Sequence, residues 1–215
     1  IQAKRQPGSS FKPFIYSAAL DNGFTASSLV NDAPIVFQEA GMEEAWRPKN
    51  DNNTFLGPIR LREALYKSRN LVSIRVLQAI GIDYARDYVA RFGFNKQDLP
   101  RNLSLALGTA NLTPMEVATG WSTFANGGYK IQPYLIDRIE SRDSQPLFIA
   151  NPPSVPHNSP PSLAEEPPIN TGNEASIEPA AAERIIDERT AFILTSMLQD
   201  VIKRGTGRRA LAMGR

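Results

Sequence analysis

The chain has 215 residues, of which 41% are hydrophobic and 21% charged, which is ordinary for a soluble globular domain with attachments. A formal net charge of +2, without a dense basic run, excludes nucleic acid as the expected partner. Cysteine is absent, and the only histidine, His157, lies among prolines, so neither a thiolate, nor a Ser-His-Asp triad, nor a metal site is supported. We therefore expect no cofactor and no metal.

Residues 1–150 form the first of three zones, and most of this zone is predicted to be helical. The first predicted helix ends before Gly23 and has one apolar face, whose members are Phe11, Phe14, Ile15, Ala18 and Ala19. Apolar spacing predicts two further helices over residues 59–67 and 71–80. Gly81 ends the second of these, and Asp83 is the expected N-cap of the next, which Gly93 ends.

A capping box opens the last helix of this zone. Thr113 and Glu116 have the spacing of that motif, and Pro114 occupies the first helical position. The helix is expected to end at residues 126–128, where asparagine precedes two glycines. After it the period changes, and a β-hairpin is predicted from apolar residues on both sides of a polar turn at residues 141–145, namely Tyr134, Ile136, Ile139, Leu147, Phe148 and Ile149.

Residues 151–182 form the second zone, a proline-rich linker. Its prolines alternate with serine, asparagine and glutamate and are Pro152, Pro153, Pro156, Pro160, Pro161, Pro167, Pro168 and Pro179. Such a stretch buries too little apolar area to offset its ordering entropy, so we favour a disordered insertion over a proline-rich ligand for a partner domain. The third zone, residues 183–215, holds one amphipathic helix over about 187–204 that Gly205 closes.

The sequence Ser9-Ser10-Phe11-Lys12 is the central chemical signal. Ser9 and Lys12 are three residues apart, so on one helix they lie on the same face. A serine hydroxyl becomes a nucleophile when a nearby base takes its proton, and a neutral lysine can be that base. The simpler interpretation of this tetrapeptide alone is a helix start, with Ser9 or Ser10 as N-cap.

The second signal is Ser68-Arg69-Asn70, between two predicted helices. Ser68 could relay a proton to or from Lys12, and Asn70 could hydrogen-bond a substrate amide. The simpler interpretation is again an N-cap pair. Together, however, Ser-x-x-Lys and Ser-x-Asn form the pattern of penicillin-interacting serine enzymes, in which Lys-Thr-Gly is the third element.

Longer segments make the resemblance specific. Residues 5–14 (RQPGSSFKPF) and 57–65 (GPIRLREAL) resemble class A penicillin-binding proteins of the 1a type, as do residues 105–109 (LALGT) and 112–128. The resemblance covers most of residues 1–140 and the helix at 187–204. It implies an α+β fold of the penicillin-binding protein and serine β-lactamase type, represented mostly by its helical part with an incomplete sheet.

The resemblance implies a peptidoglycan D,D-transpeptidase. Ser9 would be the acylated nucleophile, Lys12 its base, Ser68 the relay and Asn70 the substrate-positioning amide, and the Ser9 backbone N–H would be one oxyanion donor. The implied partners are stem peptides ending in D-Ala-D-Ala, β-lactam antibiotics and regulators of cell-wall synthesis. The parent protein would be membrane-anchored at the periplasmic face of the bacterial inner membrane and would also carry a glycosyltransferase.

The sequence contains no Lys-Thr-Gly. We therefore expect a fragment, truncated at both ends and before the Lys-Thr-Gly strand, with weakened catalysis. Two alternatives stay open. One is a serine β-lactamase or β-lactam sensor, which the release rate of the acyl group would distinguish. The other is a non-catalytic helical interaction module, in which Ser9→Ala would change nothing.

Overall fold

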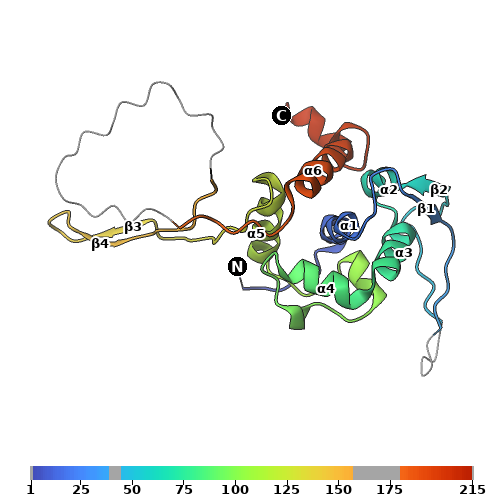
Figure 1. Cartoon of the computed structure of the whole chain (residues 1–215), viewed down its shortest axis with the longest axis horizontal. Coiled ribbons are helices and arrows are strands. Elements are labelled where there is room, and N and C mark those ends of the chain that lie inside the picture. Colours follow the sequence, from blue (N-terminus) through green and yellow to red (C-terminus); the bar gives the residue numbers. More distant parts are fainter. Residues whose placement is uncertain (1, 39–44, 157–179, 215) are drawn as a thin grey trace.

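A computed structural model describes residues 2–38, 45–156 and 180–214 (Figure 1). The helices are α1 (Lys12–Asp21), α2 (Leu61–Tyr66), α3 (Asn70–Ile80), α4 (Ile82–Ala90), α5 (Pro114–Ala125) and α6 (Glu188–Lys203). The strands are β1 (Leu29–Asp32), β2 (Gly57–Arg60), β3 (Arg138–Glu140) and β4 (Pro146–Ile149). Short 3₁₀ helices are η1 (Gly8–Phe11), η2 (Lys96–Asp98), η3 (Leu103–Leu107) and η4 (Arg208–Met213). The expected α+β class, mostly helical with little sheet, is confirmed.

Helix α1 is the centre of the helical body, and Figure 1 shows it inside a ring of the other helices. It contacts α2, α3, α4 and α6. The apolar face predicted from Phe11 to Ala19 is buried, and so are the residues between its members, including Lys12 and Ser17. A helix with neighbours on every side has no solvent-facing stripe, so its polar residues must bond inside the protein.

Aromatic side chains lock α1 to α5 and to the turn after α4. The Phe14 ring lies 5.1 Å from Phe92, 5.0 Å from Phe94 and 5.2 Å from Phe124 between ring centroids. Aromatic pairs at this separation add about 0.5–1.5 kcal/mol each beyond the area they bury. A Cβ at Gly120 of α5 would lie 2.8 Å from Phe94 Cζ and 3.0 Å from the Phe14 ring, so a larger residue there would have to displace these rings.

Helix boundaries agree with the prediction in most places. The capping box is confirmed: Thr113 accepts a hydrogen bond from the Glu116 backbone, and the Glu116 carboxylate accepts one from the Thr113 backbone. The prediction that Asp83 caps α4 is wrong, because Gly81 holds the N-cap position and Asp83 lies in the first turn. There its carboxylate pairs with Arg101 at 3.1 Å.

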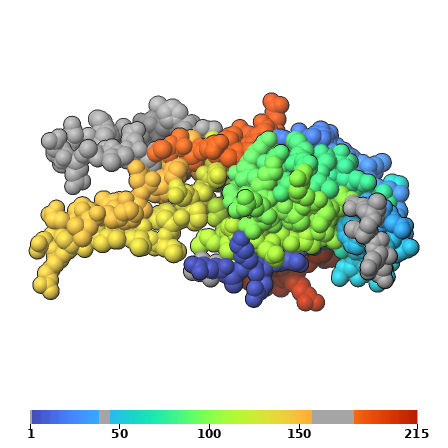
Figure 2. Space-filling view, turned by 90° about the horizontal axis from the view of Figure 1, so that it is seen from below, coloured from blue at the N-terminus to red at the C-terminus, as the bar shows by residue number. Residues whose placement is uncertain are grey.

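The predicted helix over residues 59–67 begins too early. Residues 57–60 instead form β2, which pairs antiparallel with β1 in the register Val30↔Ile59, and α2 follows directly. The second sheet is the predicted hairpin of β3 and β4, with Ile139 opposite Phe148, although Tyr134 and Ile136, which the prediction included, lie before β3 and outside the strand. Figures 1 and 2 show this hairpin projecting away from the helical body.

The chain returns to the body through residues 180–187 and α6. Arg184 forms a bridge with Tyr129, and Ser154 forms one with Ala181, so the described flanks of the proline-rich zone pair with ordered backbone. Residues 157–179, with His157, lie outside the described residues. The amphipathic helix expected at 187–204 is confirmed as α6, which buries Leu194 and Met197 against the body.

None of the helices in the described part of the chain combines the length and the apolar character that crossing a membrane requires.

Candidate active site

A close backbone contact holds the segment that carries Ser9, the predicted nucleophile. Gly8 has a φ of +59° and donates its N–H to Gly108 O at 3.1 Å. Gly108 also has a positive φ, +73°, and a Cβ there would lie 2.1 Å from Gly8 O. The LALGT segment thus has a physical role, because its glycine lets η3 approach the loop that presents Ser9.

Ser9 lies in η1, and Lys12 is the first residue of α1, so the two share a face as their spacing predicts. Neither Ser9 nor Ser10 caps the helix, which contradicts the simpler interpretation of the motif. The Ser10 hydroxyl instead donates to Pro7 O at 2.8 Å.

Lys12 is 1% exposed and brings the two motifs together. Its Nζ donates to Ser68 O at 2.8 Å, to Ser68 Oγ at 2.8 Å and to Asn70 Oδ1 at 2.7 Å. Burial, and after it the Arg69 charge, lower the pKa of Lys12 from 10.5 to about 8, while the Asp51 charge acts in the opposite direction. A lysine with this pKa reaches its neutral, basic form near physiological pH.

Ser68 links Lys12 to Ser9. Its hydroxyl accepts from Lys12 Nζ and donates to Ser9 Oγ at 3.1 Å. Within the described residues, no hydrogen bond joins Lys12 Nζ directly to Ser9 Oγ. The structure therefore gathers Ser9, Lys12, Ser68 and Asn70 at one point, with Ser68 in the middle of the chain of hydrogen bonds.

The backbone of Ser68 has an unusual conformation for a serine, with a φ of +54°. The N–H of Arg69 bonds Ala64 O and the N–H of Ser68 bonds Leu65 O, both at 2.9 Å, which is a Schellman motif at the end of α2. Glycine is usual at this left-handed position, and another residue costs about 1–2 kcal/mol there. A serine is found here despite the strain because its hydroxyl makes contacts in the site that a glycine could not make.

Two cavities meet at Ser9 and Ser68. One, of about 570 Å³, has an apolar wall that includes Leu65, Trp121, Leu198 and Ile202. The other, of about 440 Å³, is polar and is lined by residues 50–52 and 67–70 with Thr206. A carbonyl group placed beside Ser9 can therefore extend into an apolar space on one side and a polar one on the other.

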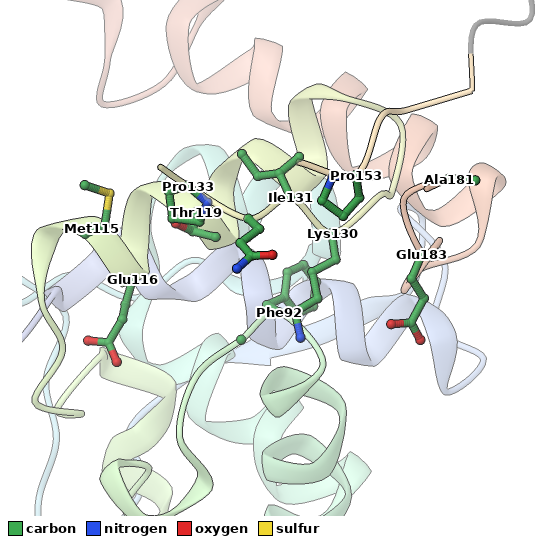
Figure 3. Close-up of a pocket in the computed structure, with 12 residues that line it drawn as sticks. Phe92, Met115, Glu116, Thr119, Lys130, Ile131, Pro133, Pro153, Ala181 and Glu183 are labelled. Atoms are coloured by element: carbon green, nitrogen blue, oxygen red, sulfur yellow. The ribbon is translucent and has the colours of Figure 1, made fainter. Parts of the chain in front are cut away.

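A third cavity, of about 600 Å³, lies at the base of the hairpin (Figure 3). Met115, Glu116 and Thr119 of α5 line it together with Lys130 and Glu183. Among the described residues it shares no lining residue with either cavity at Ser9. It therefore lies outside the site.

Several residues around the site carry no sequence motif. Trp121 donates its indole N–H to Ser10 O at 3.2 Å, and Asp32 and Asn50 lie behind the Ser68–Asn70 loop. Hydrophobic spacing marks neither Asp32 nor Asn50. No cluster of metal-ligating side chains occurs within residues 2–38, 45–156 and 180–214.

A family model described as "Penicillin binding protein transpeptidase domain" matches residues 1–213. The chain belongs to the penicillin-binding protein transpeptidase family. It is 63% identical, over its whole length, to penicillin-binding protein 1A of Pseudomonas aeruginosa and 45% identical to that of Neisseria meningitidis. The crystal structure of penicillin-binding protein 1A from Haemophilus influenzae matches 97% of the chain with a TM-score of 0.86 and 38% identity.

These relatives confirm the resemblance to the 1a type and the transpeptidase fold. The chain spans 29% and 24% of the two curated relatives and 32% of the H. influenzae chain. The match therefore concerns the transpeptidase region of much longer proteins.

Proposed function

We propose that the chain carries the acyl-transfer site of a peptidoglycan D,D-transpeptidase in a class A cell-wall synthase. The observation that supports this most directly is the hydrogen-bonded chain from Lys12 through Ser68 to Ser9, inside a transpeptidase fold. A buried lysine with its pKa lowered to about 8, one hydroxyl away from a serine, is suited to activating that serine.

Acylation begins when Lys12 is neutral. Ser9 Oγ attacks the carbonyl carbon of the penultimate D-Ala while its proton passes to Ser68, whose own proton passes to Lys12. The carbon–nitrogen bond then breaks, the terminal D-Ala leaves with the proton returned through Ser68, and an ester joins Ser9 to the donor peptide. An amine from a neighbouring stem attacks this ester and takes the acyl group.

Two further groups serve the same step. The N–H of Ser9 lies in the first turn of the helical segment, where backbone N–H groups lack helical partners, so it is one oxyanion donor. Asn70 bonds Lys12 through Oδ1 and Lys49 O through Nδ2, at 2.9 Å, and so borders the polar cavity in a fixed orientation. We assign it to the substrate amide.

The partners follow from the reaction. The donor is a stem peptide ending in D-Ala-D-Ala, and a β-lactam acylates Ser9 in its place. The activity belongs at the periplasmic face of the inner membrane, in a protein that also carries a glycosyltransferase and that regulators of cell-wall synthesis contact. Residues 1–150 and 183–215 form the transpeptidase unit in this proposal, and residues 151–182 form an insertion.

The test is the intact mass of the protein after incubation with a penicillin. We expect a gain of one β-lactam, absent in Ser9→Ala and retained in the control Ser10→Ala, whose hydroxyl bonds Pro7 O. Because the chain spans 29% of the P. aeruginosa relative, the experiment is repeated with these residues replacing the matched segment of that protein. No gain in either form contradicts the proposed function, and rapid loss of the adduct indicates a β-lactamase instead.

A further inference from the structure

A buried ion pair lies directly behind the Ser68–Asn70 loop. The side chains of Arg69 and Asp32 are 6% and 0% exposed. Arg69 Nε donates to Asp32 Oδ2 at 2.7 Å, Arg69 Nη2 lies 2.7 Å from the same oxygen, and Asn50 Nδ2 donates to Oδ1 at 2.7 Å. The Leu56 N–H also reaches Oδ2, at 3.0 Å, so both carboxylate oxygens are occupied.

The remaining donors of Arg69 hold the loop that covers the pair. Nη1 donates to Asn52 Oδ1 at 3.0 Å, and Nη2 donates to Thr54 O. The guanidinium thereby connects the catalytic loop to β1 through Asp32 and to residues 52–54. A planar fork with donors in fixed directions determines orientation more closely than apolar packing does.

Arg69 lies in the chain between the two residues whose side chains accept hydrogen bonds from Lys12. It separates Ser68, which has the left-handed backbone, from Asn70, the first residue of α3. The same covering loop bonds the next residues, because Lys49 O accepts from Asn70 and Asn50 Oδ1 accepts from the Leu71 N–H at 3.3 Å. Both groups that receive the Lys12 hydrogen bonds are therefore one residue from Arg69.

We propose that Asp32 and Arg69 form a positioning pair, which sets the placement of Ser68 and Asn70 around Lys12 and so the rate at which Ser9 is acylated. The inference rests on the proposed function and adds residues to it that the two motifs do not mark. Among the described residues neither one hydrogen-bonds Ser9, and although Arg69 also lines the polar cavity, both act through the loop.

A purely structural role is a different hypothesis with different consequences. Apolar residues of similar volume often replace a buried ion pair without loss of stability. A double variant, Asp32→Leu with Arg69→Met, is therefore expected to fold, but it lacks the guanidinium hydrogen bonds that orient the loop. If the pair serves stability alone, this variant acylates at the wild-type rate.

The charges around Lys12 supply a second readout. Arg69 and Asp51 are the charged groups that act on it, and Lys67 lines the polar cavity but pairs with Glu63 at 2.8 Å. Removing the Arg69 charge shifts the Lys12 titration upward, whereas Arg69→Lys keeps a charge there and loses the fork. Slow acylation with an unmoved titration in Arg69→Lys therefore separates the loss of the fork from the loss of the charge, and a role confined to stability leaves the acylation rate of Arg69→Lys unchanged.

The experiment compares wild type, the double variant, Arg69→Lys and a control, Arg86→Met. Arg86 is also a buried arginine, but it bonds Leu99 O and Lys96 O, far from the motifs. Acylation by a fluorescent penicillin is measured per folded molecule, in the chain and in the chimera with the P. aeruginosa relative. Thermal melting reports folding, and NMR of the lysine side-chain carbons reports the Lys12 titration.

We expect acylation on the order of 10–100-fold slower in the double variant and in Arg69→Lys, and unchanged in Arg86→Met. The Lys12 titration is expected to move upward in the double variant alone. Wild-type acylation in both the double variant and Arg69→Lys overturns the inference and leaves the proposed function intact. Failure of the wild type itself to be acylated counts against the proposed function, before any variant is compared.

Discussion

Replacing Lys12 with methionine should make the protein more stable and abolish its acylation. Methionine has a similar length and no charge, so it fits a site that is 1% exposed. The wild-type lysine must either carry its charge into that site or give up its proton on folding. Either route lowers the free energy of unfolding, because the lysine of the unfolded chain stays charged in water.

The size of the effect follows from the pKa of Lys12, which burial and Arg69 lower from 10.5 to about 8. Each pKa unit corresponds to about 1.4 kcal/mol, so at pH 7 the lysine destabilises the fold by about 3 kcal/mol relative to a neutral residue. Methionine also forgoes the hydrogen bonds to Ser68 and Asn70, but both of these are partly exposed, and water can replace part of that loss. We expect a net gain of about 2–3 kcal/mol at pH 7.

The pH dependence separates this cause from ordinary repacking. Because the folded-state pKa is the lower one, the unfolded chain holds more protons between pH 8 and 10.5, and wild-type stability rises with pH across that window. The advantage of Lys12→Met should therefore fall by about 2.5 kcal/mol and nearly vanish by pH 10. Urea unfolding of both proteins at pH 7, 9 and 10 measures it. An advantage that stays constant with pH, or grows, refutes the argument.

Three further predictions concern the same site. If neutral Lys12 is the base, as we propose, acylation of Ser9 should rise about tenfold per pH unit below pH 7 and level off above an apparent pKa near 8; a flat profile between pH 6 and 9 contradicts this. Ser68→Gly should stabilise the fold by about 1 kcal/mol in urea unfolding, because it relieves a φ of +54°, yet slow acylation as strongly as Ser68→Ala, which keeps the strain. Gly108→Ala should cost about 2 kcal/mol or more and slow acylation, because its Cβ would meet Gly8 O at 2.1 Å. Gly127→Ala has the same kind of φ but meets no atom within 4 Å, so it isolates the clash in a comparison of melting and penicillin labelling.

Local signals in the sequence were enough to place most helices. Thr113, Pro114 and Glu116 fixed the start of α5 because a capping box involves only residues three apart. The end of α3 at Gly81 was equally local, and its φ of +87° explains the glycine. Asp83 misled the prediction because Gly81, two residues earlier, supplies the N-cap geometry without a side chain.

The missed features depend on contacts between distant residues. Strands β1 and β2 are each short, and residues 33–56 separate them in the chain. No periodic pattern in the sequence therefore indicates that they are strands or that they pair. Asp32 bonds Arg69 across 37 positions in the chain, and nothing near Asp32 in sequence indicates that partner. The two motifs did identify the residues that meet at Lys12, but that Ser68 stands between Lys12 and Ser9 depends on the turn at the end of α2.

The site concentrates features that each work against folding. Lys12 is buried with a lowered pKa, Ser68 holds a left-handed backbone, and Arg69 is a charge inside the protein. Stability alone would favour methionine, glycine and an apolar residue at these positions. All three features fall within one set of contacts around Ser9, so the simplest physical account is that acylation chemistry, rather than folding, determines which residues stand there. Measuring stability and acylation on the same variants tests this directly, because the account requires the two to change in opposite directions at Lys12 and Ser68.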